Sequence, residues 1–260
     1  KGDVNFTEGV YIDRNGKNLT QTQSEKITAT DSLERKFEEL WHIMGLDKLS
    51  SHELSNISIL DCGCGNGEFL RFCRERGVLA TGLTISAEQA TLIRNKGYHV
   101  VEGSFTELYN EFIAQFDMIV FMGSLEHLEQ GLPCHTKTRE RQRKTWGRIL
   151  QLCYHYFKKD SPYRYLFSST LHLNPRFCGR SELNTLERAF GGAYQFNSLG
   201  DRLRDISELY GYQTMYSRDM TYHYYMSSIV GKNHFGRPME LSSERILVGI
   251  PGCLFIHPSI

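Results

Sequence analysis

The stretch ILDCGCGNG, residues 59–67, decides the fold of this chain. A run of apolar residues ends in Asp61, and glycines follow at every second position. Glycine turns sharply and lets the backbone approach a ligand closely. The next residues, from Glu68 to about Arg76, have a helical pattern, and the first N–H groups of a helix are left unpaired. The stretch therefore predicts a strand, a tight turn and a helix N-terminus that can hold a ligand.

The spacing of the glycines favours a nucleoside ligand without phosphates. Gly-x-Gly-x-Gly differs from the Gly-x-Gly-x-x-Gly that seats a dinucleotide pyrophosphate. S-adenosylmethionine fits this loop, because its amino-acid end can lie along Gly63 and Gly65 while its sulfonium stays free to react. A tight strand-to-helix turn without any ligand is the alternative that the loop alone leaves open.

A second strand is predicted in LATGLTIS, residues 79–86, about twenty residues after the glycines. Nucleoside sites bind the ribose at this distance, with Asp or Glu in most cases, but here Leu83 and Thr84 end the strand. Ser86 is suited to cap the next helix, and Gln89 three residues later completes a capping box. These polar residues either cap the helix only, or Thr84 and Gln89 bind the ribose hydroxyls.

Four segments of the chain resemble one family in its own order. LTISAEQ (83–89) resembles the LTxSxxQ signature of the cyclopropane-fatty-acid and mycolic-acid cyclopropane synthases, a branch of the S-adenosylmethionine-dependent methyltransferases. MGSLEHL (122–128) is similar to their GxFEHF motif, and LTQTQSEK (19–26) is similar to TLxxAQxxK. GYQ (211–213) followed by HYYMSS (223–228) resembles GFxV followed by HYxxTL.

This resemblance implies a fold, a cofactor and a set of site residues. The fold would be a Rossmann-like methyltransferase sheet, mostly parallel with an antiparallel edge strand, under an N-terminal helical cover and a helical substrate lid. The cofactor would be S-adenosyl-L-methionine, with its adenine near Ser104 and Phe105. The implied cofactor-binding residues are Phe6, Thr7, Asp61, Gly63, Cys64, Gly65, Leu83, Thr84, Gln89, Ser104, Phe105 and Met122. The implied catalytic residues are Glu126, Tyr224 and His223.

The departures from the family bear on the reaction. The run 6–11 lacks the cysteine of the family's Tyr-Ser-Cys-x-Tyr-Phe stretch, and Ser168 occupies the place of a histidine that helps to hold a bicarbonate base. Cyclopropanation needs such a base, so simple methyl transfer is the better interpretation. One alternative is a cyclopropane synthase in which Glu8 or His172 replaces the lost groups. Another is a non-catalytic module that binds the cofactor.

Two features have a structural and a functional interpretation. Glu126 either orients the acceptor or takes its proton, or it caps a helix that begins near Leu125. Eleven of the fourteen tyrosines lie between Tyr154 and Tyr225. They either pack a small helical layer with their hydroxyls in water, or form a pocket that holds a cation.

The order of predicted elements indicates a single methyltransferase domain over residues 1–260. Alternating strands and helices favour a parallel sheet. A helix capped by Asp31 and Ser32 is expected to run to Met44. The expected regions are a cover (1–50), a cofactor-binding core (51–172), a lid (173–210) and C-terminal strands (211–260). The expected strands are 57–60, 81–85, 99–102, 117–121, 164–168, 213–218 and 253–257, with a helix at 140–157.

Composition narrows the class of partner and the compartment. The chain has 30 basic and 30 acidic residues and a net charge of +0, so we expect no nucleic-acid partner but a small-molecule or lipid-like methyl acceptor. The seven cysteines show no paired spacing, which indicates a reducing compartment, and we expect the cytoplasm. No apolar run reaches transmembrane length. The histidines lack the spacing of metal ligands, so no metal is expected.

Overall fold

The computed structural model describes residues 9–13, 15–127, 139–173, 203–230 and 241–249. The strands are β1 Ser58–Cys62, β2 Leu79–Thr84, β3 His99–Glu102, β4 Met118–Met122, β5 Tyr165–Leu173, β6 Gln213–Asp219 and β7 Leu241–Gly249. The helices are α1 Gln21–Ser24, α2 Ala29–Ile43, α3 Ser51–Leu54, α4 Glu68–Glu75, α5 Ala87–Asn95, α6 Arg139–Tyr156, α8 Leu203–Leu209 and α9 Thr221–Val230. Short 3-10 helices are η1 Leu46–Lys48, η2 Asn110–Phe112 and η3 Leu125–His127.

The strands form one sheet in the order β3-β2-β1-β4-β5-β7-β6. Strands β1 to β5 pair in parallel, and β7 pairs antiparallel with both β5 and β6. The expected mostly parallel sheet is confirmed, with the opposed strand one position in from the edge. The chain changes direction across the sheet between β1 and β4. Open α/β sheets bind ligands at such a switch, beyond the carboxyl ends of the strands.

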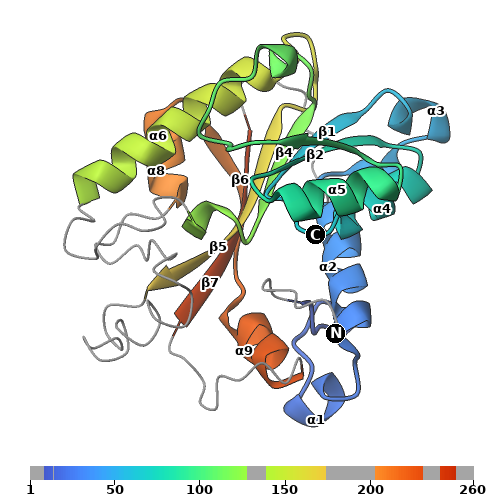
Figure 1. Ribbon diagram of the computed structural model, residues 1–260. Helices are drawn as coiled ribbons and strands as arrows, with labels where there is room; N and C mark the ends of the chain where they lie inside the picture. Colours follow the sequence, from blue (N-terminus) through green and yellow to red (C-terminus); the bar gives the residue numbers. More distant parts are fainter. Residues whose placement is uncertain (1–8, 14, 128–138, 174–202, 231–240, 250–260) are drawn as a thin grey trace.

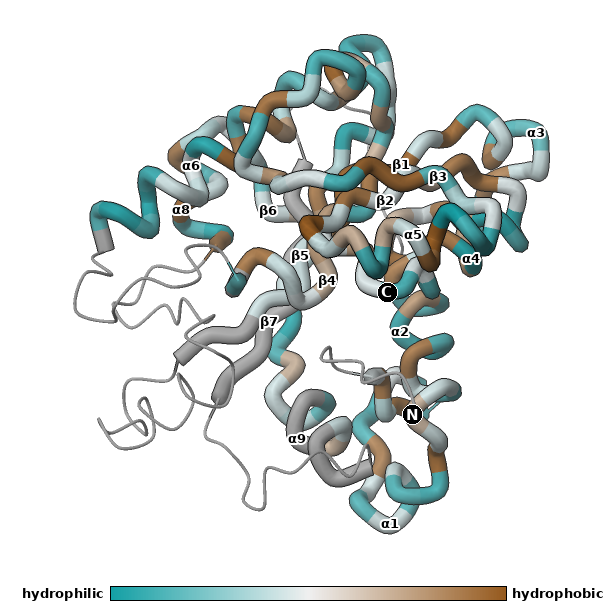
Figure 2. Tube along the Cα trace, in the orientation of Figure 1, coloured by the Kyte–Doolittle hydropathy of each residue, from teal (hydrophilic) through white to brown (hydrophobic). Residues whose placement is uncertain are grey.

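The sheet separates two hydrophobic cores. Side chains alternate along a strand, so Ile59 packs on the face covered by α2 and α4, whereas Leu60 packs on the face covered by α6 and α8. Figure 1 shows α4 and α5 on one side of the sheet and α6 and α8 on the other. Figure 2 shows hydrophobic residues along β1 and a hydrophilic first half of α6. The helix expected at 140–157 is confirmed, and its predicted core positions are all buried: Trp146, Ile149, Leu150 and Cys153.

Helix α2 covers one face of the sheet, as expected of the N-terminal region, but it starts earlier than predicted. Thr28 is the N-cap, because its side chain accepts a hydrogen bond from the backbone N–H of Asp31. Asp31 and Ser32 therefore lie inside the first turn, where the helix dipole stabilises an acidic side chain. Phe37 of α2 packs against Phe69 and Phe72 of α4 with ring centroids 5.3 Å apart.

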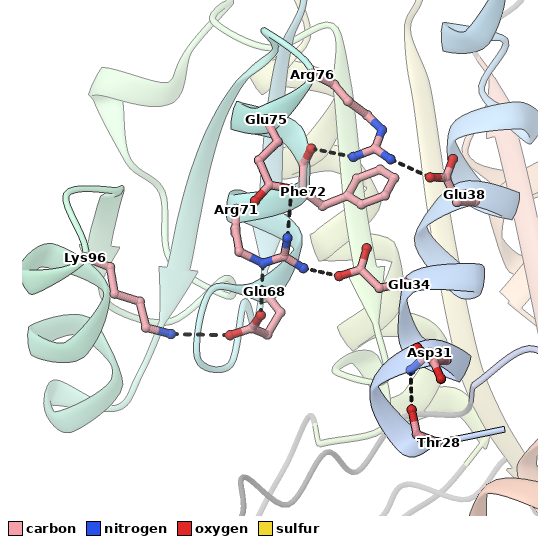
Figure 3. Close-up of polar contacts among 10 residues, drawn as sticks. All are labelled: Thr28, Asp31, Glu34, Glu38, Glu68, Arg71, Phe72, Glu75, Arg76 and Lys96. Atoms are coloured by element: carbon pink, nitrogen blue, oxygen red, sulfur yellow. Dashed lines mark hydrogen bonds and ion pairs between the residues drawn. The ribbon is translucent and has the colours of Figure 1, made fainter.

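Ion pairs fasten α2 to α4 along their exposed sides (Figure 3). Arg71 pairs with Glu34, and Arg76 pairs with Glu38. The Arg76 guanidinium also lies 3.5 Å from the centroid of the Phe72 ring. Partly exposed pairs of this kind contribute about 1 kcal/mol or less each. The aromatic packing therefore contributes most of the attachment, and the ion pairs fix its register.

The same network reaches the glycine loop. Glu68, the first residue of α4, accepts from Arg71 at 3.3 Å and from Lys96 at 3.3 Å. The Lys96 ammonium also donates to the backbone carbonyl of Asn66, inside the loop, at 3.0 Å. The loop is thus held from outside by a lysine that follows α5.

Two strand predictions need correction. Strand β5 does not end near Ser168 but extends to Leu173, because residues 165–173 pair along their whole length with β7. Strand β7 at Leu241–Gly249 was not predicted, and the strand predicted at 253–257 lies outside the described residues. At the helix expected to begin near Leu125, the described residues form only η3, and the next described α-helix begins at Arg139. Among the described helices, none is long and apolar enough to cross a membrane.

Candidate active site

The predicted site residues that the structure describes lie mainly at the carboxyl ends of β1 to β4. The turn after β1 depends on left-handed glycines, with φ of 82° at Gly63 and 54° at Gly65. The backbone N–H groups of Gly63 and Cys64 both donate to the carbonyl oxygen of Leu83, at 2.7 and 3.2 Å. These bonds tie the loop to the end of β2.

The residues of the loop differ in whether they pack against the protein or face open space. Cys64 is buried, and its sulfur fills the space that Gly82 leaves, since a Cβ at residue 82 would lie 2.7 Å from it. A Cβ at Gly63 would lie 2.5 Å from the Cβ of Ser124, so this glycine lets the loop after β4 pack closely. A Cβ at Gly65 would meet nothing within 4 Å. Gly65 is therefore the glycine that faces open space, where a ligand can lie.

Asp61 supplies a buried carboxyl group directly before the loop. Its side chain lies on the same face of β1 as Ile59 and is 1% exposed. Oδ1 of Asp61 has no hydrogen-bond partner among the described residues. The pKa of the Asp61 carboxyl group is raised to about 7, because the effect of burial exceeds the opposing effect of the Lys36 ammonium. A buried carboxyl group with a free oxygen suits a cationic ligand group.

Thr84 and Gln89 lie together at the end of β2. The Thr84 hydroxyl donates to Oε1 of Gln89 at 2.8 Å. Ser86 caps α5, as predicted, because its hydroxyl accepts from the backbone N–H of Gln89. The capping box is wrong: the backbone N–H of Ser86 donates to the Thr84 hydroxyl, so Gln89 pairs with Thr84 instead. The two side chains thus present a hydroxyl and an amide group together, and such groups can hydrogen-bond to the hydroxyls of a ligand.

The carboxyl ends of β3 and β4 complete the described part of the candidate site. The backbone N–H of Gly103 donates to the carbonyl of Thr84 at 2.8 Å, which brings Ser104 and Phe105 beside β2. Phe105 meets Phe121 of β4 edge to face, with ring centroids 5.4 Å apart. Met122 ends β4 half-buried. An aromatic and a thioether side chain at this edge offer the apolar surface that an adenine ring needs.

Sequence analysis missed Ser124, although it fixes the position of the loop after β4. Its hydroxyl donates to the carbonyl of Cys62 at 2.6 Å and is buried. Glu126 follows two residues later in η3, and His127, whose pKa is lowered by burial, ends this turn. The structure thus brings the backbone of Glu126 to the carboxyl edge. The structure does not describe the side chains of Glu126 and of Tyr224 in α9. Phe6 and Thr7 also lie outside the described residues.

His223, predicted as catalytic, is buried and holds the N-terminal segment. Its Nδ1 accepts a hydrogen bond from the backbone N–H of Tyr11 at 3.1 Å, and its ring stacks on Tyr11 at 6.4 Å. One turn later on α9, the Ser227 hydroxyl accepts from the backbone N–H of Gly9 at 2.7 Å. Figure 1 shows α9 beside the N-terminal segment. His223 therefore positions residues 9–11, which begin two positions after Thr7 of the predicted pair Phe6 and Thr7.

The described tyrosines of the last third serve mainly in packing. The Tyr156 hydroxyl donates to the carbonyl of Glu107, and the Tyr212 hydroxyl donates to the carbonyl of Leu150. Tyr222 donates to the carbonyl of Leu19. These contacts support the packing interpretation for the described rings. Among the described residues no group of three or more His, Cys, Asp and Glu side chains has the arrangement of a metal site.

We predict that His223→Phe loosens the N-terminal segment without unfolding the sheet. The ring shape is kept, but the acceptor for the Tyr11 N–H is lost, which costs about 1 kcal/mol and speeds exchange of that amide several-fold. Hydrogen exchange measured by NMR tests this at Tyr11, with Tyr222→Phe as a control that leaves His223 in place. Unchanged protection at Tyr11 would contradict the role of His223.

A family model described as methyltransferase domain matches residues 33–166. A search of curated protein sequences finds no match. Similar solved structures include the cyclopropane synthase MmaA2 of Mycobacterium tuberculosis, at 15% identity, 86% coverage of each chain and TM-score 0.61. Geranyl diphosphate C-methyltransferase of Streptomyces coelicolor A3(2) is 13% identical, with 94% of this chain and 91% of that chain covered and TM-score 0.62.

The [4+2]-cyclase SpnF has the same fold at 13% identity and TM-score 0.63, over 94% of this chain and 88% of that chain. These low identities show the shared fold only. The family model covers more than half of the chain and includes the glycine loop, the β2 end and β4. The chain therefore belongs to the methyltransferase domain family.

Proposed function

We propose that this protein transfers the methyl group of S-adenosylmethionine to a small-molecule or lipid-like acceptor. The observation that carries this proposal is the loop after β1, where Gly65 faces open space beside the buried carboxyl group of Asp61. Two similar structures point to the acceptor class: one is a cyclopropane synthase, and the other holds geranyl diphosphate and S-adenosyl-L-homocysteine. Net charge of +0 does not favour a nucleic-acid partner.

The residues of the edge fit the parts of this cofactor. Asp61 would bind the ammonium of its amino-acid end through the free Oδ1, and Gly65 leaves room for that end. The Thr84 and Gln89 pair would bind the ribose, and Phe105 would contact the adenine. Bound here, S-adenosylmethionine supplies an electrophilic methyl group on its sulfonium. The chain must then orient an acceptor and accept any proton that leaves it.

Gly65→Val is expected to abolish binding of S-adenosyl-L-homocysteine. The new side chain would enter the open space beside the loop, and φ of 54° is strained for valine. Gly211→Val is the matched control, because Gly211 also has a positive φ and open space around it. It lies before the start of β6, and therefore at the amino ends of the parallel strands, away from the candidate site. Calorimetric titration would refute the site if Gly65→Val bound as well as Gly211→Val.

The reaction we propose is simple methyl transfer. Ser168, at the predicted place of the family's base-holding histidine, is fully buried, and its hydroxyl is 2.6 Å from that of Thr170. A specific observation keeps cyclopropanation as the second candidate: β5 ends at Leu173, so His172 and not Ser168 lies near the carboxyl end.

A donor with a fully deuterated methyl group separates these two reactions. Incubated with the protein and a lipid and metabolite extract, it should give products that retain three deuterium atoms, as simple transfer requires. Mass spectrometry measures this directly. Products with two deuterium atoms would establish cyclopropanation instead, because that reaction removes one proton from the transferred carbon.

Glu126 is proposed to orient the acceptor or take its proton, together with Tyr224. It lies in η3, directly beyond β4 at the carboxyl edge. Once an acceptor is identified, Glu126→Gln should lower turnover about 10²–10⁴-fold, the usual loss for a positioned acid or base. Affinity for S-adenosyl-L-homocysteine and the melting temperature should stay unchanged. A variant with full turnover but lower stability would assign Glu126 to the fold.

The proposal also covers the domain organisation of the chain and its cellular compartment. We propose one domain in which residues 173–210 cover the acceptor, although α8 within this range packs on α6 and β6 rather than over the site. A cytoplasmic location is proposed because the described cysteines are buried and unpaired: Cys62, Cys64, Cys73 and Cys153. Buried free thiols are typical of proteins from reducing compartments.

A further inference from the structure

Residues 103–109 form the β3 loop, which follows β3 and carries Ser104 and Phe105 at the candidate site. The loop contains turns but no helix or strand, so no regular ladder of hydrogen bonds fixes its position. Where it leaves β3, the backbone N–H of Gly103 donates to the carbonyl of Thr84 at 2.8 Å. The position of the rest of the loop depends on contacts with other elements.

Tyr156, the last residue of α6, holds the loop at its far end. Its hydroxyl accepts a hydrogen bond from the backbone N–H of Tyr109 at 3.0 Å and donates to the backbone carbonyl of Glu107 at 3.0 Å. One phenol group thus pairs with a donor and an acceptor of the loop backbone, which are 47 and 49 residues away in the chain. Burial raises the pKa of Tyr156 to about 12, so the hydroxyl keeps the proton that it donates.

Tyr156 is itself fixed to the sheet. The residue is buried, and its ring meets Phe112 edge to face with the ring centroids 5.5 Å apart. Its backbone carbonyl accepts from the N–H groups of Gln115 and Phe116, just before β4, at 3.0 Å each. Its hydroxyl is therefore a fixed point for the loop that is bonded to it.

A short path of hydrogen bonds connects this fixed point to Ser104. The backbone N–H of Glu107, whose carbonyl accepts from Tyr156, donates to the carbonyl of Ser104 at 3.0 Å. In the same turn, the backbone N–H of Thr106 donates to the Ser104 hydroxyl at 3.2 Å. A shift of Glu107 would therefore move Ser104 and the residue beside it, Phe105.

The loop also closes on itself. A Cβ at Gly103 would lie 1.9 Å from the hydroxyl oxygen of Tyr109, so the last side chain of the loop occupies the space that its first residue leaves. Tyr109 is the residue whose backbone N–H donates to Tyr156. Holding Tyr109 thus holds both ends of the loop.

We propose that Tyr156 is a positioning residue of the cofactor site, which fixes the β3 loop so that Ser104 and Phe105 meet the adenine and select it over other purines. The inference rests on the proposed function. Tyr156 lies beside the residues that precede β4, at the amino ends of the parallel strands, so it acts through the loop and not by direct contact with a ligand.

The test is calorimetric titration of Tyr156→Phe, which removes the hydroxyl and keeps the ring, with two probes. S-adenosyl-L-homocysteine carries adenine, and S-inosyl-L-homocysteine carries hypoxanthine instead. The wild type should prefer the first probe, because a site that hydrogen-bonds a purine amino group rejects a purine without it. In the variant, S-adenosyl-L-homocysteine should bind about tenfold more weakly, the effect of losing two ordinary hydrogen bonds, and the preference should fall several-fold.

Tyr212→Phe is the matched control. Tyr212 is also buried, and its hydroxyl donates to a backbone carbonyl outside the β3 loop, that of Leu150, at 2.7 Å. Its loss should lower the melting temperature, as the loss of the Tyr156 hydroxyl does, but leave the affinity for S-adenosyl-L-homocysteine and the preference for adenine unchanged. This comparison separates positioning of the loop from a general loss of stability.

Hydrogen exchange at the Tyr109 amide, measured by NMR without any ligand, reads the state of the loop directly. Tyr156→Phe should speed this exchange several-fold, and Tyr212→Phe should not. The inference is overturned by unchanged exchange at Tyr109, by unchanged affinity for S-adenosyl-L-homocysteine, or by a preference for adenine that is absent in the wild type or unaltered in Tyr156→Phe. If the wild type binds neither probe, the proposed function fails, while the exchange at Tyr109 still decides whether Tyr156 fixes the loop.

Discussion

The carbonyl oxygen of Leu83 is the point on which the candidate site depends. It accepts from the N–H groups of Gly63 and Cys64, so the loop after β1 is held at the end of β2. The next carbonyl, of Thr84, holds the end of β3, and the Ser124 hydroxyl joins the loop after β4 to β1. Four strand ends are thereby fixed to one another by hydrogen bonds to backbone carbonyl groups. The side chains at this edge are left to meet a ligand.

Local signals were sufficient where each element carries its own pattern. Strand β3 has its predicted bounds, and β1, β2 and β4 differ from the prediction by one or two residues at either end. These strands are short apolar runs bounded by turn residues, as is usual for a parallel sheet that is covered on both faces. The glycine loop was equally clear from sequence, because glycine adopts left-handed conformations at little cost.

What the sequence did not predict depends on contacts between distant segments. Strand β7 carries polar residues at successive positions, and pairing with both β5 and β6 makes it a strand. The side chain of Gln89 had two possible partners, and the choice of Thr84 follows from the hydrogen bond that Ser86 already makes with that threonine. His223 and Tyr11 are 212 residues apart in the chain, so no local pattern could relate them.

The cover helix α2 carries charged side chains on both its outward and its inward side. Its outward glutamates pair with α4, and Glu39 pairs with Arg218 of β6 at 2.5 Å, all on partly exposed sides. Salt screens such pairs, because water surrounds them. Lys36 on the inward face lies out of reach of that screening. The outer ion pairs that attach the cover therefore weaken as salt is added, whereas the buried charge of the same helix does not respond to it.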